Sequence, residues 1–134
     1  MSTLTWRNAS HRTGHEKIDA KNKRIVSLYN QLQTISCEQN YDEIVMDVLG
    51  ELVEYTDHLA IEEKILEENG YTKLDEHKRK HSAFLEELCS LCESYEDRHP
   101  QLLVKLTSLL EIWWEHHIIE DVVKNKHFIA TTTH

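Results

Sequence analysis

The sequence predicts an all-α protein, and its composition and hydrophobic spacing both indicate this class. Only three glycines and one proline occur in 134 residues, which leaves few positions for the tight turns that join β-strands. Hydrophobic residues recur three or four positions apart, which is the spacing of an amphipathic helix. We therefore expect an antiparallel up-down four-helix bundle with an irregular N-terminal arm.

The chain is long enough to bury a hydrophobic core without disulfides, so we expect a single domain over 1–134. We divide it into an arm (1–14), the bundle (15–129) and a tail (130–134). Three cysteines, an odd number, and the lack of a secretory leader favour a reducing compartment. We expect a cytoplasmic protein.

The charge of the chain excludes two classes of partner. The formal net charge is −9, whereas nucleic acids and anionic membranes attract clusters of Lys and Arg. No apolar run reaches the length of about 18 residues that a membrane span needs. We therefore expect no nucleic-acid or membrane partner, and a monomer or weak oligomer whose protein partners the sequence does not identify.

The first 14 residues are polar and broken by Ser, Asn, Thr and Gly, so we expect an irregular arm anchored by Trp6. A helical pattern begins near His15 and should end near Cys37–Asn40. Its inward stripe contains Ile18, Ile25, Tyr29 and Leu32. Asn22 lies on the same stripe and should therefore point inward.

The second helix should run from about Tyr41 to Asn69, because Gly70 supplies a left-handed residue that can end it. Its inward residues are Val48, Leu52, Tyr55, Glu62 and Leu66. The third helix should run from about Thr72 to Arg98. Its inward residues are Leu74, His77, His81, Phe84, Leu88, Cys92 and Tyr95.

The fourth helix should start at Pro100, because proline suits the first turn of a helix. We expect it to continue as one helix towards Phe128. Its inward residues are Leu106, Leu110, Trp113, His117 and Asp121. With short connections, four such helices pack as an up-down bundle.

Three of the expected helices carry pairs of potential metal ligands spaced four residues apart. The pairs are His58 with Glu62, His77 with His81, and His117 with Asp121. Four residues of an α-helix turn through about 400°, so both members of a pair share a face. An up-down bundle brings these pairs, and Asn22, to one level. Imidazoles with carboxylates favour iron or manganese over structural zinc, so we predict a metal site there.

The motifs that carry these residues resemble the hemerythrin family, specifically its single-domain bacterial members. After an arm with a tryptophan, the motifs are ID at 18–19, YTDHLAIEE at 55–63, HKRKHSAF at 77–84 and WWEHHI at 113–118. Their order follows the family's signature, and the resemblance covers nearly the whole chain.

The resemblance implies a non-haem di-iron centre that binds O2 reversibly, with two carboxylates and an oxygen species bridging the irons. By position, His77, His81 and His117 would hold one iron. His58 would bind the other iron, the one that takes O2, and Glu62 would bridge the two. Such a protein is an oxygen carrier, store or sensor rather than an enzyme.

One departure from the family lies in the first helix. Three residues after the Asp of its Ile-Asp pair, the family has a histidine where this chain has Asn22. An amide oxygen is a weaker ligand for Fe(II) than imidazole, so the O2-binding iron should be labile, with occupancy between one and two irons per chain. Asn22 is equally compatible with a buried amide that bonds Glu62 or water.

A second departure lies in the fourth helix. The family's bridging Asp falls five residues after its His, a position that Val122 occupies here, whereas Asp121 falls four after His117. His116 keeps the five-residue spacing to Asp121, but five residues leave the common face of a regular helix. We take His117 with Asp121 as ligands and keep His116 as the alternative.

Two other functions fit the same residues. A di-iron enzyme could act on peroxide or nitric oxide through the coordination position vacated at Asn22. An iron-storage or regulatory bundle would instead carry weakly bound or substoichiometric iron. Reversible O2 binding would distinguish a carrier from both.

Overall fold

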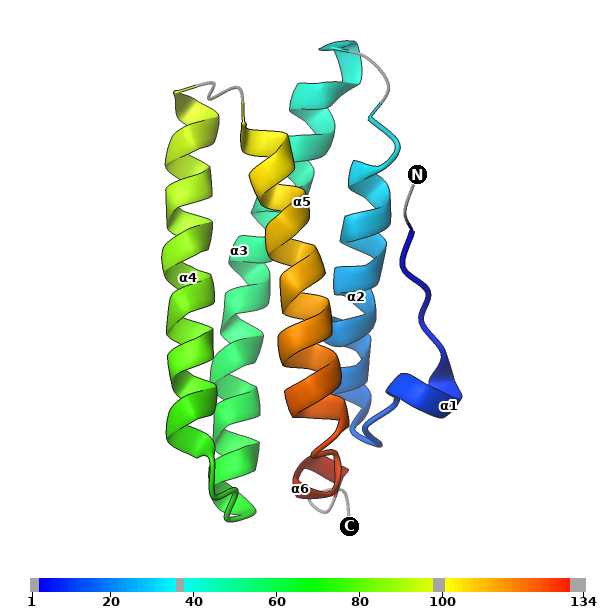
Figure 1. Ribbon diagram of the computed structural model, residues 1–134, viewed down its shortest axis with the longest axis vertical. Helices are drawn as coiled ribbons and strands as arrows, with labels where there is room; N and C mark the ends of the chain where they lie inside the picture. Colours follow the sequence, from blue (N-terminus) through cyan, green and yellow to red (C-terminus); the bar gives the residue numbers. More distant parts are fainter. Residues whose placement is uncertain (1–2, 36–37, 98–100, 131–134) are drawn as a thin grey trace.

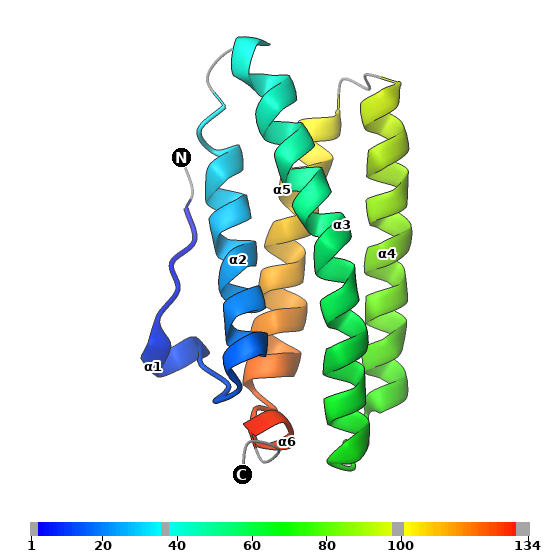
Figure 2. The same cartoon turned by 180° about the vertical axis from the view of Figure 1, so that it is seen from behind.

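The chain is described from a computed structural model, over residues 3–35, 38–97 and 101–130 (Figure 1). The long helices are α2 (Glu16–Leu32), α3 (Glu38–Glu68), α4 (Leu74–Glu96) and α5 (Leu102–Ile112), which a π-helix, η1 (Trp113–Val123), continues. Each long helix runs antiparallel to the next, as Figures 1 and 2 show from opposite sides. The predicted all-α up-down bundle is confirmed.

The C-terminal end of α3 confirms the predicted glycine stop. Gly70 adopts a φ of 71°, the left-handed conformation that glycine tolerates best. Its N–H donates to Glu67 O at 3.1 Å, and the Tyr71 N–H donates to Leu66 O at 3.0 Å. These two bonds form a Schellman motif, which satisfies carbonyls that a helix end leaves unpaired.

Other helix ends differ from the predicted ones. The first helix is shorter than predicted, because α2 ends at Leu32. The next three N–H groups, from Gln33 to Ile35, donate to carbonyls three residues earlier in the chain, as in a tight 3-10 turn. The third helix, α4, begins at Leu74 and ends at Glu96, two residues inside each predicted limit. The predicted start at Pro100 lies outside the described residues.

The fourth helix departs most from the prediction of one regular helix. After Ile112 the backbone widens into the π-helix, which ends at Val123, and a turn then leads to the short α6 (His127–Ala130). The buried residues of η1 are spaced four and five apart, in two stripes: Trp113, His117 and Val122, and Trp114, Ile118 and Val123. A π-turn, closed by i→i+5 hydrogen bonds, is wider than an α-turn, so residues five apart share a face.

The buried apolar side chains form two clusters separated along the bundle axis. On α3, Leu59 belongs to the larger cluster and Leu66 to the smaller one at the lower end in Figure 1. On α2, Ile18 belongs to the smaller cluster and Ile25 to the larger one. The buried polar residues Asn22 and Glu62 lie between these positions, so polar side chains form a layer inside the apolar bundle.

The N-terminal arm packs along the outside of the bundle and contains one helical turn, α1 (Asn8–His11). The Leu4 N–H donates to Asn30 Oδ1, and Asn30 Nδ2 donates back to Leu4 O, both at 2.8 Å. Trp6 packs against Trp114, with ring centroids 6.2 Å apart. Among the helices in the described part of the chain, none is long and apolar enough to cross a membrane.

Candidate metal centre

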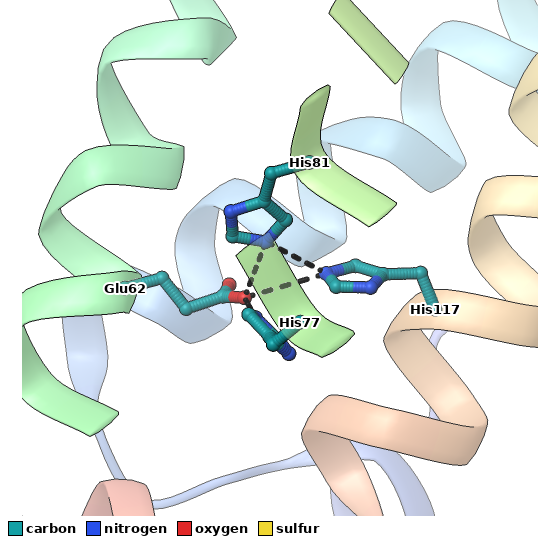
Figure 3. A group of neighbouring side chains, drawn as sticks. All are labelled: Glu62, His77, His81 and His117. Carbon is teal, nitrogen blue, oxygen red and sulfur yellow. Dashed lines mark hydrogen bonds and ion pairs between the residues drawn. The ribbon is translucent and has the colours of Figure 1, made fainter. Parts of the chain in front are cut away.

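Three buried histidines, His77, His81 and His117, converge on one carboxylate oxygen of buried Glu62 (Figure 3). Glu62 comes from α3, His77 and His81 from α4, and His117 from η1. One donor atom of each residue lies within 4.8 Å of the others. The up-down topology explains this meeting, because the end of α3, the start of α4 and the end of η1 lie at the same level of the bundle (Figure 1).

The distances between these atoms match the spacing of ligands around one cation. Glu62 Oε1 lies 3.2 Å from His81 Nε2 and 3.4 Å from His117 Nε2, and these two nitrogens are 3.1 Å apart. His77 Nε2 also contacts Glu62 Oε1. Donors held about 2.1 Å from a metal ion lie ~3.0 Å apart at right angles and ~3.4 Å apart in a tetrahedron. Glu62, His81 and His117 therefore have the spacing of ligands around a first-row transition-metal ion, and His77 lies beside them.

The ionisation state of Glu62 suits a metal ligand. Burial opposes the charged form of this fully buried carboxyl, but its contacts with four histidine side chains outweigh that penalty and hold its pKa well below the usual range. The histidines, in the order of their effect, are His117, His58, His77 and His81. Glu62 is therefore a carboxylate, and a buried carboxylate needs compensating positive charge.

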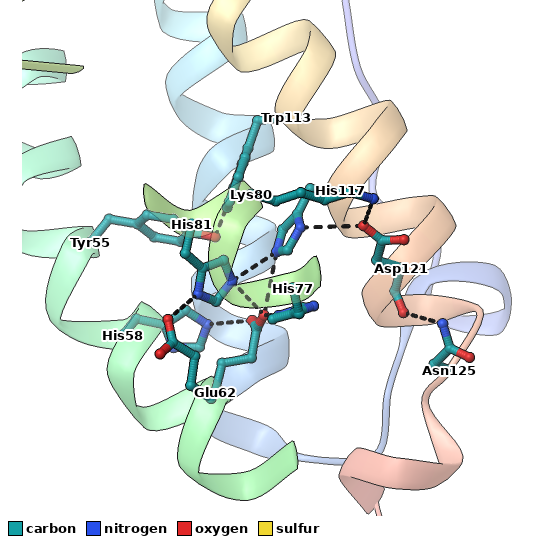
Figure 4. A network of polar contacts seen from close by, with 11 residues as sticks. Tyr55, His58, Glu62, His77, Lys80, His81, Trp113, His117, Asp121 and Asn125 are labelled. Carbon is teal, nitrogen blue, oxygen red and sulfur yellow. Dashed lines mark hydrogen bonds and ion pairs between the residues drawn. The ribbon is translucent and has the colours of Figure 1, made fainter. Parts of the chain in front are cut away.

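The second oxygen of Glu62 faces a different histidine. His58 Nε2 lies 3.4 Å from Glu62 Oε2 (Figure 4), and neither atom has a hydrogen-bond partner in the described part of the chain. Glu62 thus directs one oxygen at His77, His81 and His117 and the other at His58. A carboxylate that bridges two cations divides its oxygens in this way.

Asn22 is fully buried in α2, as its position on the inward stripe predicts. Neither its amide oxygen nor its amide nitrogen has a hydrogen-bond partner among the described residues. Each unpaired buried polar atom costs about 1–3 kcal/mol. The amide is therefore available to a ligand, although it does not belong to the group of four donors.

Asp121 lies at the edge of the site, outside the group of four donors (Figure 4). Its Oδ2 forms an ion pair with Lys80 and lies 3.6 Å from His117 Nδ1. Burial opposes ionisation, but His117 and Lys80 outweigh it and lower the pKa of Asp121 to about 2. Because the π-turn directs the fifth residue inward, Val122 takes the position behind His117 and is only 1% exposed.

The structure brings His117, and not the neighbouring His116, to the site. His117 is buried, whereas His116 is exposed and its Nδ1 lies 3.6 Å from Glu120 Oε2 on the same exposed face of η1. The widened helix does not turn His116 inward.

Sequence reasoning assigned no role to Glu63, whose Oε2 accepts a hydrogen bond of 2.7 Å from His81 Nδ1. The only signal in the sequence was its place beside Glu62 in the second motif. A carboxylate next to an inward stripe is usually solvated, and contact with a neighbouring helix depends on how the helices pack.

Two cavities border the site. A polar cavity of about 420 Å³ contains His77, Lys80 and Asp121 in its wall. An apolar cleft of about 270 Å³ is lined by Lys80, Ala83, Phe84, Leu109, Ile112, Trp113, His116 and His117. The polar cavity thus borders His77, and the apolar cleft borders His117.

A four-helix bundle with a buried layer of histidines and a carboxylate defines a class of non-haem metal-binding proteins. Within it, residues 13–121 match the family model Hemerythrin, described as the hemerythrin HHE cation binding domain. The chain belongs to the hemerythrin family, as its motifs indicated. Membership implies a non-haem iron-binding domain, and the group of buried His and Glu residues agrees with it.

Several curated relatives are called bacteriohemerythrin. The chain is 31% identical over 122 residues to one from Pseudomonas aeruginosa, covering 90% of this chain and 78% of the relative. It is 29% identical to one from Stenotrophomonas maltophilia, with the same coverage. The identity to one from Clostridium acetobutylicum is 28%, over 80% of this chain and 87% of the relative. No solved structure gives a significant match.

Proposed function

We propose that this protein binds O2 reversibly at a non-haem di-iron centre, as an oxygen carrier, store or sensor. The observation that carries the proposal is the division of Glu62 between two sets of histidines. Its Oε1 faces the three Nε2 atoms of His77, His81 and His117, and its Oε2 faces His58 Nε2. The names of the bacteriohemerythrin relatives agree with this assignment.

The two proposed irons have unequal sets of protein ligands. Glu62 with His77, His81 and His117 would hold one iron. Glu62 with His58 and Asn22 would hold the other. With fewer and weaker donors, this second iron is more labile and more open to an exogenous ligand.

The apolar side chains around the histidines favour reversible O2 binding over a catalysed reaction. Leu59, Trp113 and Ile118, all buried, exclude bulk water from the histidines. A dry site limits the protonation that accompanies loss of bound oxygen species. The apolar cleft beside His117 suits the entry of an uncharged small molecule such as O2.

Metal analysis with visible spectroscopy tests the proposal. Protein reconstituted with Fe(II) under anaerobic conditions should carry between one and two irons per chain. Exposure to O2 should produce a visible absorption band that disappears on degassing and returns on reoxygenation. Binding of zinc alone, or no band after iron loading, would overturn the proposal.

Adjacent histidines provide a matched pair of variants for this experiment. His117→Ala should lose iron and the band, because His117 faces Glu62. His116→Ala should retain both, because His116 is exposed. Repeated turnover of hydrogen peroxide or nitric oxide by the wild type would indicate an enzyme instead, and substoichiometric iron without a band would indicate a store.

A further inference from the structure

We propose that Glu63 is a positioning residue of the metal centre: it fixes the proton of His81 on Nδ1 and so directs the Nε2 lone pair at the metal. This inference rests on the proposed metal centre, but it does not depend on O2 binding. Glu63 ends the YTDHLAIEE motif but is not one of the proposed metal ligands, so the inference gives this residue a role.

The proposal starts from a short contact between two helices. Glu63 Oε2 accepts a hydrogen bond of 2.7 Å from His81 Nδ1. Glu63 directly follows Glu62 on α3, and successive residues of an α-helix are rotated by about 100°. Glu62 therefore reaches the centre of the bundle, while Glu63 reaches α4 from the rim, where its side chain is 26% exposed.

This contact determines which nitrogen of His81 can bind metal. An ionised carboxylate only accepts hydrogen bonds, so Nδ1 must carry the proton. A neutral imidazole has one such proton, and Nε2 then presents a lone pair. That atom lies 3.2 Å from Glu62 Oε1 and 3.1 Å from His117 Nε2, inside the four-donor group.

The resulting arrangement favours a cation. With its proton on Nδ1, a neutral His81 directs a lone pair at the Glu62 carboxylate, and two such groups repel each other unless a positive charge lies between them. A carboxylate bonded to the far nitrogen also makes an imidazole a stronger donor to a metal. Glu63 thus prepares His81 for metal before the metal binds.

The equivalent contact at His117 is longer. Asp121 Oδ2 lies 3.6 Å from His117 Nδ1, beyond hydrogen-bond distance, and is also paired with Lys80. Glu63 is therefore better placed than Asp121 to orient a histidine ring, and removal of Glu63 should lower metal affinity more than removal of Asp121.

Nuclear magnetic resonance of the metal-free protein tests the proposal directly. Imidazole 15N shifts at about pH 8, where unperturbed histidine is neutral, report which ring nitrogen carries the proton. Wild-type protein should show His81 protonated on Nδ1. Glu63→Ala should shift the population towards protonation on Nε2, and Glu63→Gln, which keeps an amide acceptor, should restore part of the wild-type signal.

Metal affinity supplies a second measurement, with Zn(II) or Co(II) as the probe and a competing chelator. Glu63→Ala should lower the affinity about 10–100-fold without changing the number of ions bound tightly. Glu67→Ala is the matched control, because Glu67 is exposed and lies one turn further along α3. It removes the same charge and should change neither measurement.

Three results would overturn the proposal. An unchanged His81 tautomer in Glu63→Ala would show that another group fixes the ring. Equal affinities of Glu63→Ala and Glu67→Ala would show that only net charge matters. Loss of a whole metal equivalent in Glu63→Ala would identify Glu63 as a ligand. The tautomer measurement needs neither metal nor O2, so its failure is distinct from failure of the proposed function.

Discussion

The indole ring of Trp113 stacks on the imidazole of His117, with ring centroids 3.9 Å apart and planes inclined by 22°. Its Nε1 donates a hydrogen bond of 3.0 Å to Tyr55 Oη across the bundle (Figure 4). Burial, with the charge of Glu62, raises the pKa of Tyr55, so its hydroxyl stays neutral. One tryptophan thus connects α3 to the ring that faces the metal centre.

We expect Tyr55→Phe to lower the free energy of unfolding of the metal-free protein by about 1–3 kcal/mol, because it leaves the buried Trp113 N–H without an acceptor. Chemical denaturation would measure the change. Tyr41→Phe is the control, because Tyr41 is only partly buried and lies at the other end of the bundle. Equal stability of the two variants would contradict the structural role of this hydrogen bond.

The histidines should differ in their contribution to iron binding. His77→Ala or His81→Ala should lose more iron, and lower the melting temperature of the iron-loaded protein further, than His58→Ala. The first two belong to the four-donor group, and metal that binds only the folded state stabilises it. Iron analysis and thermal unfolding would measure both effects, and His58→Ala should keep about one iron per chain. Equal losses from all three variants would show that the donors are not divided as we propose.

We expect Asn22→His to tighten the second iron and to prolong the O2 adduct. The amide of Asn22 is fully buried and has no hydrogen-bond partner among the described residues, and an imidazole is a stronger donor to Fe(II). Iron stoichiometry should rise towards two per chain, and autoxidation should slow. If stoichiometry, band and autoxidation rate all stay at wild-type values, Asn22 does not serve the centre.

The ion pair of Asp121 should make the stability of the metal-free protein depend on acidity. The folded-state pKa is about 2, below the ordinary value of 3.8, so the stabilisation is complete above the ordinary value and is lost as the pH falls through about 2. The difference between wild type and Asp121→Asn should be about 1 kcal/mol near neutral pH and should shrink between about pH 4 and pH 2.

Denaturation curves at several pH values would measure this difference. Glu120→Gln is the control, because Glu120 is exposed and its carboxylate lies beside His116 rather than His117. A difference between wild type and Asp121→Asn that is constant with pH would show that the charge of Asp121 does not stabilise the fold.

The sequence alone determined the fold class and the level of the candidate metal centre. Hydrophobic spacing identifies a helix and its inward face, and short connections make neighbouring helices antiparallel. Ligand pairs near matching ends of their helices must then meet, which is how Glu62, His77, His81 and His117 could be predicted to converge. The left-handed Gly70 likewise followed from residue type alone.

Only the tertiary structure decided how the edge of the centre is built. The widening of the fourth helix into a π-helix depends on packing, and it directs Val122 inward and leaves Asp121 with Lys80. The contact of Glu63 with His81 depends on the rotation of α3 against α4, which helical periodicity does not specify. Spacing along one helix identifies the face of a side chain, whereas a contact between two helices is fixed by how both surfaces pack.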